Sequence, residues 1–228
     1  MCYVVGNTVS CLTSVCYNIA MADVIPITMV RDTLTDLPRY PIPEGYSIRK
    51  FKGGEGPLWA EIGAAAGNFG DLAAAQERFN VEFSEPVEDM ESRCFFVVHD
   101  ETDRAVGTAM AWYDPNFDDG SGRSPSRPEC DDGSGRSLSR PAYGRVHWVA
   151  IIPDFQGKRL AKPLLSAVLS RLAESHTKAV LGTQTFRKPA VRLYLDLGFR
   201  PFPKLPTCPQ AWKELAEEFK HPALASYL

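Results

Sequence analysis

Apolar and polar positions become regular from residue 46 onward and predict strands interleaved with helices. Residues 46–51 alternate as an edge strand does, whereas 94–99 and 145–152 are largely apolar runs typical of buried strands. Apolar residues recur at every fourth position from Leu160 to Leu172, which marks the buried side of a helix. The pattern therefore predicts a mixed α/β fold.

The predicted strands and helices lie between residues 46 and 220. Strands are predicted at 46–51, 94–99, 105–113, 145–152, 179–185 and 199–202. Helices are predicted over 57–83, with a break near residues 67–70, and at 158–174, 189–197 and 209–220.

Three segments stand apart from this pattern. Residues 1–45 read as a tail and an extended lead-in, and 204–228 as a C-terminal helical extension. Residues 118–128 recur almost letter for letter as 131–141. Two polar copies are too few for a stacked repeat and bury little apolar surface, so 115–142 is expected to be a disordered, duplicated insertion.

Composition limits the class of protein and its partners. A net charge of −3 and an apolar share of 44% favour an ordinary globular protein and give no reason to expect a nucleic-acid partner. No apolar run has the length of a membrane span. The six cysteines lack any Cys-x-x-Cys pair, so reduced thiols in a cytoplasmic protein without a metal site are expected.

Residues 1–20 need not belong to the native protein, because translation could begin at Met1 or at Met21.

A loop that leads into a helix is the first candidate for chemistry. The strand at 145–152 ends at a Pro153-Asp154 break, and Gln156-Gly-Lys-Arg-Leu-Ala161 follows at the start of the predicted helix. The first turn of a helix has N–H groups without intrahelical partners and carries partial positive charge, so it binds phosphate. Lys158 and Arg159 add two cations there.

A second motif closes the predicted domain, and the two motifs together resemble one family. Residues 187–199 read Arg-Lys-Pro-Ala-Val-Arg-Leu-Tyr-Leu-Asp-Leu-Gly-Phe, close to Asn-x-x-Ala-x-x-Leu-Tyr-x-x-x-Gly-Phe. Residues 156–161 are similar to Gln/Arg-x-x-Gly-x-Gly/Ala. Both patterns are signatures of the GNAT superfamily of N-acetyltransferases, and the resemblance covers residues 46–203. It implies a mixed, mostly antiparallel central sheet with splayed central strands, flanked by helices (α/β of the α+β type).

The resemblance implies acetyl-CoA as cosubstrate and no metal. The pantetheine arm would add to the strand edge near Val149 and Ile151, where splaying leaves backbone groups unpaired. The diphosphate would lie over the N–H groups of 156–161. The implied cofactor-binding residues are Val149, Ile151, Gln156, Gly157, Lys158, Arg159, Leu160, Ala161 and Arg187. Arg159 departs from the family's Gly, and Pro163 should bend the first turns of the helix.

Two side chains are candidates for proton transfer. The resemblance gives Tyr194 the role of protonating the departing CoA thiolate, although Tyr194 also fits an apolar helix face. His147 is a candidate base, because alternation places it on the same face as Val149 and Ile151, but a structural histidine is an equal alternative. The acidic residues between Glu82 and Glu91 could attract a cationic amine, and a solvated loop is the plainer interpretation.

The expected function is transfer of an acetyl group from acetyl-CoA to a primary amine by direct attack in a ternary complex. The acceptor could be a small molecule or a protein, and the chain a monomer or a homodimer. A non-catalytic acyl-CoA sensor on the same fold is the alternative, because fold does not determine function. Tyr194 in its full motif favours the enzyme, and Arg187 in place of the usual Asn favours the sensor.

Overall fold

The computed structural model describes residues 25–83, 87–114, 117, 143–203 and 208–228. The expected duplicated insertion at 118–141 and the tail at 1–20 lie outside these residues.

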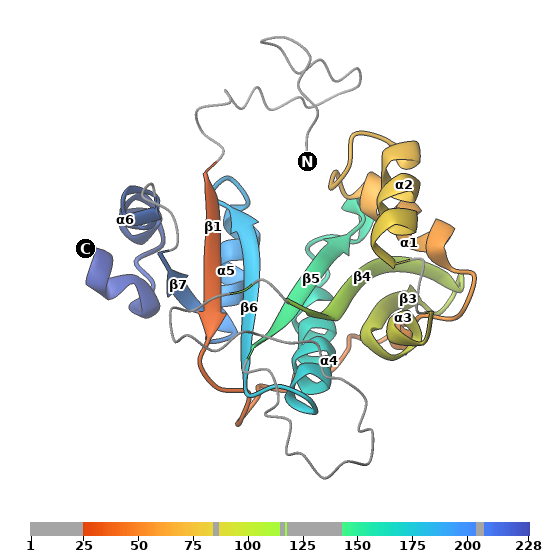
Figure 1. Ribbon diagram of the computed structural model, residues 1–228, viewed down its shortest axis with the longest axis horizontal. Coiled ribbons are helices and arrows are strands. Elements are labelled where there is room, and N and C mark those ends of the chain that lie inside the picture. Colours follow the sequence, from red (N-terminus) through yellow and green to blue (C-terminus); the bar gives the residue numbers. More distant parts are fainter. Residues whose placement is uncertain (1–24, 84–86, 115–116, 118–142, 204–207) are drawn as a thin grey trace, which may run out of the picture. The chain divides into compact units, whose positions relative to one another are not determined.

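Most strands and helices lie within a few residues of their predicted positions. Figure 1 shows their arrangement. The strands are β1 (Pro26–Arg31), β2 (Tyr46–Lys50), β3 (Cys94–His99), β4 (Arg104–Tyr113), β5 (Tyr143–Ile151), β6 (Lys178–Gln184) and β7 (Arg200–Phe202). The helices are α1 (Gly56–Ala65), α2 (Leu72–Phe83), α3 (Val87–Arg93), α4 (Ala161–Ala173), α5 (Lys188–Asp196) and α6 (Cys208–Phe219), with short 3-10 helices η2 (Pro153–Phe155) and η3 (Pro222–Tyr227).

The strands form one open sheet in the order β2-β3-β4-β5-β6-β1-β7. The pairs β2–β3, β3–β4 and β4–β5 are antiparallel, whereas β5–β6 is parallel. A mixed sheet flanked by helices confirms the predicted fold class.

Packing divides the described residues into two compact units, one within residues 30–181 and one of residues 25–29 with those described within 182–228. In the larger unit, helices lie on opposite faces of β5. A Cβ at Gly144 would meet Leu172 of α4, whereas Trp112, opposite the neighbouring Arg145, contacts Phe83 of α2 at 4.9 Å between ring centroids. In the smaller unit, α6 is the amphipathic helix that was predicted, and it buries Ala211, Trp212 and Leu215.

Three local predictions need correction. The lead-in contains a true strand, β1, and residues 87–93 form helix α3 rather than a loop. Helix α4 begins at Ala161 and not at Lys158, because Gly157 and Arg159 have left-handed backbones, with φ of +75° and +62°. Pro163 therefore falls in the first turn, where its missing N–H removes no intrahelical hydrogen bond.

Candidate active site

A bulge in β5 sets the geometry of the candidate site. On β4, Thr108 pairs with Ala150 and Met110 pairs with His147, so Ala109 alone stands opposite two residues, Trp148 and Val149. Trp148 has φ +47°, a left-handed conformation that is uncommon for a residue other than glycine. Such a bulge breaks the alternation of side chains along a strand, so that neighbours can point the same way.

The bulge brings His147 and Trp148 to the same carboxylate. His147 Nε2 lies 2.6 Å from Oε1 of Glu82 on α2, and Trp148 Nε1 donates to Oε2 at 3.3 Å. Arg78, one turn earlier on α2, lies 3.9 Å from Oε2. All three contacts join residues of the larger unit, and the indole ring of Trp148 packs on Phe69 at 4.8 Å.

The environment sets the protonation of this pair. Burial raises the pKa of Glu82, but the hydrogen bonds and charges of His147, Trp148 and Arg78 outweigh it, so the pKa is lowered and Glu82 is ionised. Burial lowers the pKa of His147 below 6.5 despite the opposing effect of Glu82. A neutral imidazole beside a carboxylate must donate from Nε2, which leaves the Nδ1 lone pair available to accept a proton.

Two sequence interpretations are wrong at this place. His147 does not share a face with Ile151, since the bulge pairs His147 with Met110 and Ile151 with Gly107, on opposite sides of β4. Of the acidic residues between Glu82 and Glu91, Glu85 lies outside the described residues and Glu88 is exposed, whereas the other three lie on helices and have partners. Glu82 binds His147, Asp89 accepts from the Tyr113 hydroxyl at 3.1 Å, and Glu91 accepts from the Gly53 amide at 2.9 Å.

The second half of β5 has fewer backbone partners than the first half. Among the described residues, the ladder between β5 and β6 covers only Tyr143, Gly144 and Arg145. At the far end, the Ile151 carbonyl accepts from the Gln156 side chain at 2.9 Å, so it is not unpaired as expected. Val149 lies between these places, half-buried.

The loop after β5, predicted to bind phosphate, turns sharply into α4. The 3-10 helix η2 turns the chain, and the left-handed backbones at Gly157 and Arg159 lead it into α4. Nothing lies within 4 Å of a Cβ built at Gly157. Lys158 and Arg159 are exposed, and Leu160 is the N-cap of α4 without a side-chain cap. The N-terminal turn of α4, with its partial positive charge, thus has two exposed cations beside it.

Tyr194 and Arg187 belong to the other unit. Tyr194 lies on α5, is 7% exposed and has its ring 6.1 Å from that of Phe199. Burial raises the pKa of Tyr194 to about 12, against a smaller lowering by the charge of Arg187. Tyr194 therefore keeps its proton at neutral pH. Arg187 is the N-cap of α5, where its side chain makes no cap hydrogen bond.

Most of the predicted site residues thus lie in the larger unit. His147, Val149, Ile151 and the loop at 156–161 all belong to residues 30–181, whereas Arg187 and Tyr194 belong to residues 182–228. Sequence reasoning missed Glu82 and Trp148 as partners of His147.

Neither a group of metal ligands nor a membrane-spanning helix is found in the described part of the chain. It holds no group of three or more His, Cys, Asp or Glu side chains suited to a metal ion. No helix there is both long enough and apolar enough to cross a bilayer.

Comparison with known proteins defines the class. Residues 68–199, more than half of the chain, match the sequence model of the Acetyltransferase (GNAT) family. The chain belongs to this family, whose members transfer acyl groups from acyl-CoA.

Individual relatives are distant. Mycothiol acetyltransferase of Corynebacterium aurimucosum is 30% identical over 101 residues, which are 41% of this chain and 33% of that protein. A GCN5-related N-acetyltransferase from Sphaerobacter thermophilus superimposes with a TM-score of 0.54 at 19% identity, over 79% of this chain and 50% of the other. A GNAT-family acetyltransferase from Colwellia psychrerythraea gives 0.52 at 11%, over 80% and 56%. The chain therefore spans a third to about half of these relatives, and the two structures support the fold alone.

Proposed function

We propose that the chain transfers an acetyl group from acetyl-CoA to a primary amine by direct attack in a ternary complex. The observation that carries this proposal is the His147–Glu82 contact of 2.6 Å, with a neutral imidazole beside an ionised carboxylate. A sensor that only binds acyl-CoA needs no general base. Transfer to an amine does, because the ammonium group must lose a proton before it can attack.

The base answers a specific chemical difficulty. An alkyl ammonium with a pKa of about 10.4 is neutral in roughly one molecule per thousand at pH 7. Nδ1 of His147 accepts the proton of the ammonium, and the charge of Glu82 stabilises the imidazolium that forms. Arg78 holds Glu82 from the opposite side.

The remaining steps balance atoms and charge. The amine nitrogen attacks the thioester carbonyl, the C–N bond forms, and the tetrahedral intermediate expels the CoA thiolate as the C–S bond breaks. The family motif gives Tyr194 the role of returning a proton to that thiolate, and its buried phenol holds the proton at neutral pH. The nitrogen loses its second proton as the amide forms, and this proton restores the Tyr194 phenol, while His147 releases the proton of the ammonium to solvent. The products are the amide, CoA and that one released proton.

Acetyl-CoA is assigned to the second half of β5 and the loop that follows. The diphosphate would bind at the N-terminal turn of α4, where the helix dipole favours an anion, with Lys158 and Arg159 beside it. The pantetheine arm would pair with the β5 edge near Val149, beyond the three residues that pair with β6.

A thiol-release assay with acetyl-CoA tests the proposal. The panel contains alkyl amines, amino sugars, amino acids and peptides, and His147→Gln is the matched inactive variant. We expect turnover with at least one amine in the wild type and its loss in the variant. Tight CoA binding by calorimetry with no turnover across the panel would instead support the non-catalytic acyl-CoA sensor.

A further inference from the structure

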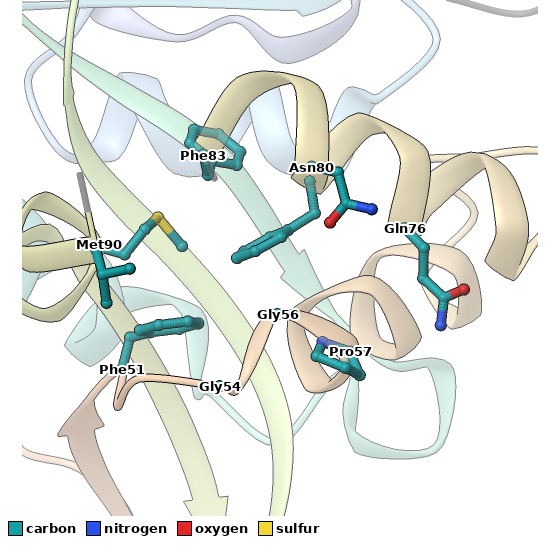
Figure 2. A pocket seen from close by; sticks show the side chains of 10 residues that line it. Phe51, Gly54, Gly56, Pro57, Gln76, Asn80, Phe83 and Met90 are labelled. Atoms are coloured by element: carbon teal, nitrogen blue, oxygen red, sulfur yellow. The ribbon is translucent and has the colours of Figure 1, made fainter. Parts of the chain in front are cut away.

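A cavity of about 280 Å³ lies in the larger unit where the end of β2, the start of α1, the end of α2 and α3 meet (Figure 2). Its inner wall is made by Phe51, Phe83 and Met90, which are buried, with Phe79 between them. Gln76 and Asn80 are exposed on the outer side, where they project from α2. No residue that lines this cavity carries a charge.

The local structure holds these walls in place. Gln76, Phe79, Asn80 and Phe83 are spaced by three and four residues, so they share one side of α2. Phe79 packs so closely on the start of α1 that a Cβ at Gly56 would lie 2.4 Å from its ring. The ring of Phe79 is stacked on Phe51 at 6.0 Å and 23°.

Phe83 separates the cavity from the proposed base. Its ring forms part of the cavity wall and also stands edge-on to Trp112 at 4.9 Å and to His147 at 6.2 Å. An occupant of the cavity would thus touch a side chain that touches His147. Because Phe83 intervenes, this occupant is distinct from the amine that reacts.

We propose that the cavity is a second small-molecule site, and that it takes a neutral single-ring aromatic compound with one hydrogen-bonding substituent. A cavity of about 150 Å³ already accommodates benzene, so the larger volume here leaves room for a short polar substituent. Aromatic walls favour offset and edge-on contacts with a ring. The amides of Gln76 and Asn80 offer donors and acceptors to the substituent, and the absence of a counter-charge opposes an ionised ligand.

The probe for this site is 2-phenylethanol, titrated into the full chain and followed by calorimetry and by the NMR signal of the His147 ring. Val87 lines the cavity and is 42% exposed, so Val87→Trp fills the mouth without disturbing the core. Val81→Trp is the matched control, since Val81 is 75% exposed on α2 and does not line the cavity.

We expect the wild type and Val81→Trp to bind the alcohol, Val87→Trp to lose binding, and the His147 signal to shift as the wild type saturates. Absence of binding to the wild type, or equal binding by a correctly folded Val87→Trp, would overturn the site. Equal binding of protonated 2-phenylethylamine would overturn its preference for neutral ligands. A His147 signal that stays fixed at saturation would overturn the link through Phe83. None of these readouts requires acyl transfer.

Discussion

The two halves of β5 differ in backbone regularity and in the chemistry they can support. From Gly144 to His147 the strand is paired with β4, and its first three residues, from Tyr143 to Arg145, pair with β6. The second half begins with the left-handed Trp148 and, among the described residues, pairs with β4 and not with β6. It leads into a loop with two further left-handed residues. A strand that pairs regularly on both sides satisfies its backbone groups through its neighbours, so the irregular half can receive a ligand, and His147 lies at the junction of the two halves.

Replacement of His147 is the change with the largest expected effect, because it removes the base at the junction of the two halves. His147→Gln should lower kcat about 10²–10⁴-fold, the range of a positioned general base, and leave the Kd of CoA unchanged. The matched control is Trp148→Phe, which keeps an aromatic ring against Phe69 and loses only the N–H to Glu82. A kcat of His147→Gln within a few-fold of wild type would contradict the role of this base.

Replacement of Tyr194 tests whether a residue of α5 takes part in proton transfer together with His147 of β5. Tyr194→Phe retains a ring against Phe199 and removes the phenolic proton. If the phenol protonates the thiolate, kcat should fall in the same range, about 10²–10⁴-fold, with acetyl-CoA affinity unaltered. Steady-state kinetics with calorimetry separate the two effects, and near-normal turnover would return Tyr194 to a purely packing role.

A smaller loss is expected when the base is kept but its partner is neutralised. Glu82→Gln removes the negative charge and allows the amide to donate to Nε2, which favours the wrong tautomer. We expect kcat to fall at least about 10-fold, and less than for His147→Gln. Glu77→Gln on the exposed side of α2 is the control. Equal rates for the two variants would show that Glu82 does not act on the base.

Because Gly157 and Arg159 have left-handed backbones, replacements in this loop should affect CoA binding and folding stability differently. A left-handed backbone costs a residue other than glycine about 1–2 kcal/mol, and Arg159→Gly removes this cost. The greater flexibility of Gly in the unfolded chain offsets part of the gain, so the free energy of unfolding should not fall. Loss of a charged hydrogen bond should weaken CoA binding about 10-fold. Gly157→Val, in the same conformation, should lose about 1–2 kcal/mol of stability. Urea unfolding and calorimetry report both quantities, and a destabilised Arg159→Gly would contradict the strain.

The smallest effect concerns pH. The folded pKa of His147 lies below its ordinary 6.5 and that of Glu82 below 4.5, so the unfolded chain binds more protons than the folded one in both windows. Stability contributed by the pair is therefore present at neutral pH and is lost on acidification, first below 6.5 through His147 and then below 4.5 through Glu82. In His147→Gln, the urea midpoint should fall less steeply with pH between about 6.5 and 5.

Apolar periodicity placed most elements of the larger unit, because burial of one face dictates where helices and strands lie, but it missed the short helix α3 and set the start of α4 too early. The Gly position of the family pattern also indicates a left-handed backbone at residue 159, which the structure retains despite the Arg side chain. The His147–Glu82 contact was beyond reach, since its members are 65 residues apart, and the contact of Trp148 with the same carboxylate depends on the bulge. An irregularity of one residue leaves no periodic signal.

The contact of Glu82 with His147 also joins a helix to the sheet that it covers. The hydrogen bond that orients the imidazole therefore also contributes, beside the packing of Phe79 and Phe83, to docking α2. Whenever α2 opens locally, a fraction of molecules holds an imidazole free to rotate and change tautomer, although the sheet stays folded. Warming should then diminish activity before global unfolding begins, in step with hydrogen exchange of the α2 amides.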